Sequence, residues 1–171
     1  MHMRIIRWGA VVVAALAMMV FAQSGSQNPD IYKGSIQDRV DALAKIQPGL
    51  GTVMIEYGNR MTNAYYAAKG GNWGLAQYQI KEATEIQETG EITRTANAAL
   101  LKSVEKQYIQ PLNDAVLAMD WPAFQQKFDT MVTQGCNACH AATGHPYIEY
   151  KLPPQPAESY LDFGLQSKSK K

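Results

Sequence analysis

The stretch "LGTVMIEYGNRMTNAYYAAKGGN", Leu50 to Asn72, sets the structural period of this 171-residue chain. Its apolar side chains fall at steps of three and four: Leu50, Val53, Met54, Tyr57, Met61, Ala64, Tyr65 and Ala68. That spacing places them on one face of an α-helix. The helix is predicted to begin after Pro48 and to end at "KGGN", where the glycines permit a left-handed turn.

Three further helices follow from the same period. Asn72 is the predicted N-cap of the second helix, which is expected to end at "ETGE", Glu88 to Glu91. The third is predicted from Ile92 to Met119, with a kink at Pro111. Asp120 is the expected cap of the fourth, in which Pro122 fits the first turn. The expected inner faces carry Trp73, Ala76, Ile80, Ala83 and Ile86, then Ala96, Leu100, Val104, Tyr108, Leu112 and Ala115, then Phe124, Phe128, Met131 and Val132.

Four helices with short connections predict an all-α fold, an up-down-up-down four-helix bundle over residues 48–143. Residues 23–47 are polar and broken by Gly and Pro, which indicates a flexible leader with a short helix over Gln37 to Ile46. Residues 144–171 are rich in Pro and aromatic side chains. We expect them to form an irregular extension packed on the bundle, with a basic tail, "QSKSKK".

The N-terminus has the pattern of a signal peptide over residues 1–22. A basic start, "MHMRIIR", precedes an apolar run from Trp8 to Phe21, and "VFAQ" offers a cleavage site after Ala22. That run is shorter than the roughly 20 residues of a membrane span. The mature protein is therefore expected to be periplasmic, without stable membrane insertion, and an uncleaved N-terminal anchor is the alternative. A net charge of +1 and the absence of a basic face speak against nucleic acid as a partner.

Both cysteines of the chain lie in "CNACH", Cys136 to His140. A disulfide between them would close too small a loop to constrain the unfolded chain. The C-x-x-C-H spacing is instead typical of covalent c-type haem attachment. On one helical turn, Cys136 and Cys139 can form thioethers to the two vinyl groups of one porphyrin, and His140 becomes the proximal iron ligand. The motif predicts one covalently attached haem c.

Three other interpretations of the motif fit less well. A thioredoxin-like redox pair needs a βαβ pattern, which is absent from the sequence. A structural zinc site needs four ligands, and the mature chain has two cysteines and two histidines in all. A small disulfide beside an unrelated histidine remains the third interpretation.

The sixth iron ligand decides the function and stays open at this stage. In an up-down bundle the end of the fourth helix lies beside the start of the first, so the haem should face Met54, with Tyr57 lining the pocket. Met61 lies about 10 Å further along the axis, which is expected to be too far. Met119 and Met131 are expected near the opposite end. His145 is the alternative ligand, and an iron with no sixth protein ligand is the third option.

Two functions follow from these options. Two firm ligands suit a monohaem cytochrome that passes single electrons between redox partner proteins, which is the leading hypothesis. An open iron suits a protein that binds or senses NO or CO. We do not expect an enzyme, because a peroxidase needs a distal acid-base group and His145 is the sole histidine left for that role.

A four-helix bundle with C-x-x-C-H near the end of its last helix resembles the cytochrome c-prime family and its low-spin relatives. The resemblance extends from Leu50 to Ala142. More narrowly, "PGLGTVM", "GNWGLAQY" and "CNACHAATGHPYI" are similar to segments of a bacterial family of small exported haem-protein candidates whose function is largely unassigned. The resemblance implies a homodimer through the first two helices as a further option. The long tail after His145 departs from cytochrome c-prime.

Overall fold

The computed structural model describes residues 30–165, so the predicted signal peptide, the leader up to residue 29 and the basic tail from residue 166 lie outside the described residues. Every regular element within this range is helical, and no strand occurs there. The predicted all-α class is confirmed. None of the helices in the same range has the length and apolar character needed to cross a bilayer.

The chain divides into two compact units at Ile46. In the first unit, α2 runs over Ile36–Lys45, which agrees within a residue with the short helix predicted there. It begins with a capping box: the Ser35 hydroxyl accepts the Asp38 N–H at 3.2 Å, and the Asp38 carboxylate accepts the Ser35 N–H at 2.8 Å. These two bonds satisfy backbone donors that a helix start leaves unpaired.

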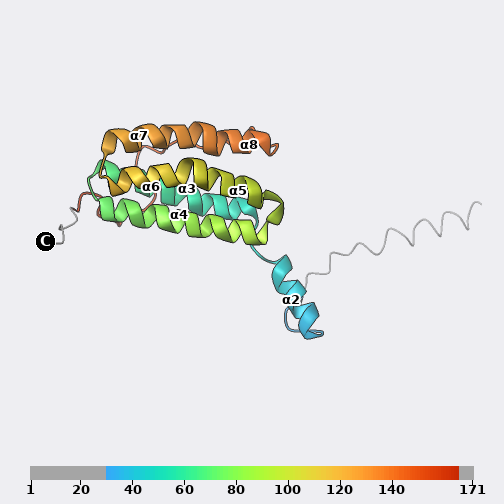
Figure 1. Ribbon diagram of the computed structural model, residues 1–171. Helices are drawn as coiled ribbons and strands as arrows, with labels where there is room; N and C mark the ends of the chain where they lie inside the picture. Colours follow the sequence, from blue (N-terminus) through green and yellow to red (C-terminus); the bar gives the residue numbers. More distant parts are fainter. Residues whose placement is uncertain (1–29, 166–171) are drawn as a thin grey trace, which may run out of the picture. The chain divides into compact units, whose positions relative to one another are not determined.

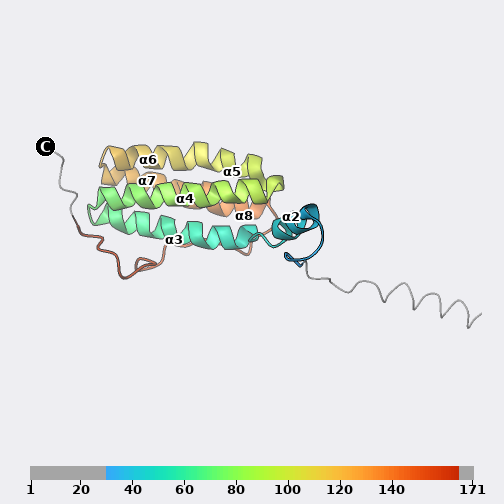
Figure 2. The ribbon, with the colours of Figure 1, turned by 90° about the horizontal axis from the view of Figure 1, so that it is seen from below.

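The second unit begins with two antiparallel helices, α3 (Leu50–Lys69) and α4 (Trp73–Thr93), which lie side by side in Figures 1 and 2. Gly71 makes the turn between them with φ +80°, a conformation that glycine adopts without steric cost. The Asn72 side chain accepts the Leu75 N–H at 3.1 Å. The predicted start and end of the first long helix and the predicted cap of the second are confirmed.

The end predicted for the second helix at Glu88 to Glu91 is wrong, because α4 continues to Thr93. Gly90 does not break the helix. A Cβ at this position would lie 3.0 Å from Leu50 Cδ1 and 3.2 Å from Val53 Cγ1, so the glycine permits α3 and α4 to approach closely. The chain turns instead at the short 3₁₀ helix η2, Thr95–Asn97. Ala96, expected on an inner face, is exposed there.

The third helical segment is continuous from α5 (Ala98–Val104) through the π-helical turn η3 (Glu105–Ile109) to α6 (Gln110–Leu117). The disturbance predicted at Pro111 takes the form of this wide turn. A proline ring has no N–H and crowds the preceding helical turn. A π turn just before it is one of the recognised ways in which a helix absorbs such an interruption.

The fourth segment is also continuous, from α7 (Trp121–Thr130) through the π-helical turn η4 (Met131–Asn137) to α8 (Ala138–Ala142), and these elements lie in line in Figure 1. The Asp120 carboxylate accepts the Ala123 N–H at 3.0 Å, and Pro122 lies in the first turn. Both predictions are confirmed.

Aromatic rings fill the part of this unit in which α3, α4 and α7 meet. The ring centroids of Tyr65 and Phe128 are 4.9 Å apart, those of Trp121 and Phe124 5.9 Å, and those of Phe124 and Phe128 6.0 Å. Phe124 and Phe128 are buried almost completely. Such contacts add to the free energy gained from burying the rings.

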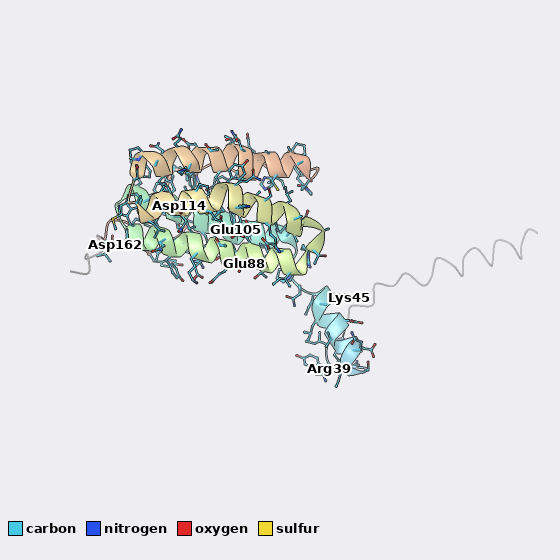
Figure 3. All side chains as sticks on the ribbon, viewed as in Figure 1. Arg39, Lys45, Glu88, Glu105, Asp114 and Asp162 are labelled. Atoms are coloured by element: carbon cyan, nitrogen blue, oxygen red, sulfur yellow. The ribbon has the colours of Figure 1, made fainter. Side chains whose placement is uncertain are left out.

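Residues 144–165 form no helix or strand, and side chains of α3 and of its C-terminal turn hold them. The Tyr66 hydroxyl donates to the Pro153 carbonyl at 2.6 Å, and the Asn63 side-chain oxygen accepts the Ala157 N–H at 3.0 Å. The Asn72 amide donates to the Asp162 carbonyl at 2.9 Å. Figure 2 shows this segment running beside α3, and Figure 3 labels Asp162.

Candidate functional site

A cavity of about 600 Å³ opens where the start of α3, α5 and the C-terminal end of the fourth segment meet residues 145–150. This volume lies within the ~300–1,000 Å³ typical of cofactor and ligand sites. Most of its lining side chains are apolar. The lining comprises Leu50, Gly51, Met54, Ile55, Tyr57, Gly58, Met61, Gln87, Asn97, Leu100, Leu101, Val104, Met131, Gly135, Cys136, Cys139, His140, Thr143, His145, Ile148, Glu149 and Tyr150.

The structure brings all five residues singled out from the sequence to this one cavity. Met54 and Tyr57 come from α3, one turn apart, Cys136 from η4, and Cys139 and His140 from α8. They are separated by about eighty positions in the sequence, and the helical packing alone unites them. These five residues bring two thiols, one imidazole, one thioether and one phenol to the cavity.

The hydrogen bond of His140 determines which of its ring nitrogens can act as a ligand. His140 Nδ1 lies 2.9 Å from the backbone carbonyl oxygen of Ile148. A carbonyl oxygen can only accept, so Nδ1 carries the proton. In the neutral ring, Nε2 then has a free lone pair, which is the form of histidine that binds a metal. The backbone of the C-terminal segment thus sets the tautomer of His140.

The two thiols are neutral and are not bonded to each other. Burial, together with the neighbouring Cys139, raises the pKa of the Cys136 thiol to about 12. Burial also raises the pKa of Cys139. A thioredoxin-like pair needs the opposite, a thiol whose pKa is lowered so that a thiolate forms near neutral pH. This environment therefore argues against a thiol-disulfide redox pair.

Tyr57 is buried inside the cavity wall, and its hydroxyl donates to Met131 Sδ at 3.8 Å. Burial raises the pKa of this phenol well above its ordinary value, so the hydroxyl stays protonated and remains a donor. The expectation that Tyr57 lies beside the pocket agrees with this position.

Two methionines that the sequence placed far from the site line it. Met61, expected to be out of reach, and Met131, expected near the opposite end, both contribute to the cavity wall. The expectation for Met131 is wrong, because η4 begins at this residue, only one turn before Gly135. Met61 reaches the cavity wall because the cavity extends along three turns of α3, and its expected distance from the iron stays a prediction. Met119 is 62% exposed in the connection before α7, away from the cavity. Three thioethers, those of Met54, Met61 and Met131, thus surround the cavity.

His145 lies at the rim of the cavity. Its Nδ1 is 3.4 Å from the Thr143 hydroxyl, and its ring centroid is 5.9 Å from that of Tyr147. The Thr143 hydroxyl in turn contacts the Cys139 carbonyl at 3.0 Å. These contacts hold His145 near the end of α8.

Three residues of the site escaped the sequence analysis: Asn137, Ile148 and Tyr150. Asn137 makes two hydrogen bonds to the backbone of Tyr150, accepting its N–H at 2.8 Å and donating to its carbonyl at 3.2 Å. The Tyr150 hydroxyl lies 2.9 Å from the Thr62 hydroxyl on α3. No periodic pattern marks an irregular segment, so only the position of Asn137 between the two cysteines could have drawn attention to it.

The donor set fits a haem better than a bare metal ion. Within residues 30–165, no group of three or more His, Cys, Asp and Glu side chains is placed to hold an ion. One imidazole with a free Nε2 is instead what an iron already held by a porphyrin requires of a protein. Two unpaired thiols one helical turn apart face the same apolar space.

A second hollow, a groove of about 770 Å³, lies between α4 and the third helical segment. Glu88, Glu105 and Asp114, labelled in Figure 3, contribute to its wall together with Lys81 and Glu85. The groove contains no cysteine, histidine or methionine. It therefore offers none of the ligands that the first cavity gathers.

Comparisons with protein-family models, with curated proteins and with solved structures each found no match to this chain.

Proposed function

We propose that this chain is an exported monohaem c-type cytochrome that transfers single electrons. The observation that carries the proposal is the convergence of Cys136, Cys139 and His140 on one apolar cavity, with the His140 Nδ1 proton bound to a backbone carbonyl. The Nε2 atom of that ring is the one left for iron.

Each residue has a defined role in this proposal. The Cys136 and Cys139 thiols would each add across one vinyl group of the porphyrin, with the sulfur on one vinyl carbon and the S–H hydrogen on the other, so that no atom leaves. His140 Nε2 would bind the iron, and the apolar wall would exclude water. The haem supplies a one-electron change between ferric and ferrous iron. The protein would tune this change through burial of the haem, through the ligand His140 and through the hydrogen bond at His140 Nδ1.

The proposed architecture is an up-down-up-down four-helix bundle of the cytochrome c-prime kind, with residues 144–171 as an extension packed on it. Its support is the order of α3, α4, the segment 98–117 and the segment 121–142, which are joined by short connections. The contacts of α3 with α4 and α7, and of α6 with α4 and α7, agree with that arrangement.

For the sixth ligand we favour Met54, which lies on α3 at the cavity, with His145 at the rim as the alternative and Met61 and Met131 as the competing thioethers. Two firm ligands hold the iron in one geometry in both oxidation states and so suit electron transfer. The partners would be redox proteins that dock transiently through a small interface, with a homodimer as a further option. Export through the signal peptide at residues 1–22 would place the protein in the periplasm.

A visible spectrum tests this function. The full chain is expressed with haem-maturation machinery, and spectra are recorded oxidised and reduced, with and without carbon monoxide. Narrow reduced bands that carbon monoxide does not move are the expected result. Broad bands that shift with carbon monoxide would replace electron transfer with the binding or sensing of NO or CO. A chain without covalent haem would contradict both functions.

Single substitutions identify the ligand. Met54→Ala is expected to turn the narrow reduced bands into bands that respond to carbon monoxide, because the iron loses its second protein ligand. Met61→Ala and Met131→Ala are compared at the same expression level. Loss of the narrow bands in one of these two variants, and not in Met54→Ala, would move the ligand to that residue.

A further inference from the structure

We propose that residues 145–150 form a strap that positions His140, and that Asn137 is the residue that holds this strap in place. The inference deepens the proposed function, because the imidazole that the strap orients is the proposed iron ligand. Asn137 is a positioning residue here and does not itself contact the iron.

The strap begins with a tight reversal at the end of α8. Gly144 has φ +83°, and the His145 N–H donates to the His140 carbonyl at 2.8 Å. The Ile148 N–H then donates to the His145 carbonyl at 2.9 Å. This second turn brings the Ile148 carbonyl back over the helix end, where it meets His140 Nδ1 at 2.9 Å.

Asn137 fastens the strap one helical turn before His140. Its side-chain oxygen accepts the Tyr150 N–H at 2.8 Å, and its amide donates to the Tyr150 carbonyl at 3.2 Å. An amide side chain can donate and accept at the same time, so it pairs with a peptide unit as a second strand would. Since positions three apart share one helix face, the clasp and the imidazole lie on the same side of the segment.

Tyr150 ties the other edge of the strap to α3. The Thr62 hydroxyl donates to the Gly58 carbonyl at 2.8 Å, so in the 2.9 Å contact between the two hydroxyls it is Tyr150 that donates. A Cβ at Gly58 would lie 3.6 Å from the Tyr150 ring, so the ring packs directly against the backbone of α3. The strap therefore spans the two walls of the cavity.

The function of the strap is to fix the direction and the basicity of His140. A hydrogen bond from Nδ1 to a carbonyl holds the ring in one rotation and places more electron density on Nε2. A more basic Nε2 stabilises ferric iron over ferrous iron. Removal of the clasp should therefore raise the reduction potential.

The first test uses the haem-bearing chain. Asn137→Ala is compared with Asn113→Ala, which removes the same side chain from α6 away from this cavity. Without the clasp the Ile148 carbonyl should leave His140, and loss of the hydrogen-bond partner of a metal-binding histidine changes metal affinity by about tenfold or more. If that loss weakens binding of ferric iron alone, the potential rises by ~59 mV for a one-electron couple. A shift in Asn137→Ala that does not exceed the shift in Asn113→Ala would overturn the proposal.

The second test uses the full chain expressed without haem maturation and does not depend on the proposed function. Nitrogen NMR follows the Nδ1 proton of His140. In the parent chain this proton should exchange slowly with water, and in Asn137→Ala at least tenfold faster, with unchanged helix content by circular dichroism. Equal exchange rates in the parent, Asn137→Ala and Asn113→Ala would contradict the strap, whether or not the chain ever binds haem.

Tyr150→Phe is the milder variant and guards against a folding defect in Asn137→Ala. It keeps the ring and both backbone bonds to Asn137 and removes only the bond to Thr62. The potential should rise in the same direction by a smaller amount. A rise larger than that of Asn137→Ala would show that Tyr150, and not Asn137, is the residue that holds the strap.

Discussion

In the second unit, α3 and the fourth helical segment pack tightly against each other at one end and enclose a cavity at the other. At one end, Tyr65 of α3 packs on Phe128 of α7 with ring centroids 4.9 Å apart, and Phe124 and Phe128 are almost completely buried. At the other end, Met54 and Tyr57 of the same helix face Cys136 across a cavity of about 600 Å³.

The difference lies in what completes each end. The chain's own aromatic rings fill the first end, as side chains fill an ordinary protein core. Flexible methionines surround the second, and thioether side chains adapt to an irregular or a bound shape. The contrast indicates that the aromatic end of the second unit supplies stability and the methionine-lined end supplies space for a ligand. Each of the following predictions tests this division.

The largest expected effect is a difference in stability between Phe128→Ala and Met61→Ala. Phe128→Ala removes a fully buried ring and should lower the free energy of unfolding by ~3–5 kcal/mol, with or without haem. Met61→Ala enlarges an existing cavity and should cost about 2 kcal/mol in the haem-free chain, and more once haem packs against Met61. Denaturant titrations of both forms measure this. Equal costs at the two sites, unaffected by haem, would contradict the division.

A smaller effect is expected at Gly135, directly before Cys136. A Cβ there would lie 3.1 Å from Tyr108 Cδ2 and 3.3 Å from its Cγ, and Tyr108 would have to shift. Gly135→Ala should therefore cost ~1–3 kcal/mol of unfolding free energy, the range typical of overpacking. Gly51→Ala is the matched control, since nothing lies within 4 Å of its added Cβ. Thermal unfolding compares the two, and a stabilising Gly135→Ala would show that Tyr108 moves freely.

The smallest effect concerns alkaline pH. Burial raises the pKa of Cys136 and that of Tyr150 to about 12. In the folded chain both groups therefore keep their protons to a higher pH than in the unfolded chain, where the thiol begins to lose its proton at about pH 9 and the phenol at about pH 10. The stability that this difference contributes is complete below these values and falls as the pH rises toward 12.

Haem attachment should shift the onset of this loss upward, since a thioether sulfur does not titrate. Unfolding midpoints measured between pH 8 and 11 should begin to fall near pH 9 in the haem-free chain and near pH 10 in the haem-bearing chain, where Tyr150 still titrates. The same onset in both forms would mean that Cys136 carries no thioether.

Residues that cap helices or turn the chain between them made most of the fold predictable from the sequence. Gly71, Asn72 and Asp120 act locally, through a left-handed turn or a single side-chain bond, so their effect can be inferred from neighbouring residues. Gly90 was misjudged because its role is non-local: it lets α4 approach Leu50 and Val53. A glycine's packing partners cannot be inferred from its own stretch of sequence.

The same distinction applies to the site. The C-x-x-C-H spacing is local, and the structure places Cys136, Cys139 and His140 at one cavity. Met131 was misplaced because η4 begins at this residue only one turn before Gly135, and Met61 lines the cavity because the cavity follows three turns of α3. The hydrogen bond from His140 Nδ1 to the Ile148 carbonyl depends on two successive turns in an irregular segment, which has no period to detect.

The most direct test of the central claim is the intact mass of the exported chain, followed by the mass of the peptide that contains Cys136 to His140. We expect the mass of one haem on the chain, located on this peptide and absent from the double variant Cys136→Ala, Cys139→Ala. A peptide that carries no haem, and loses two hydrogens to a disulfide between the same cysteines, would contradict the account.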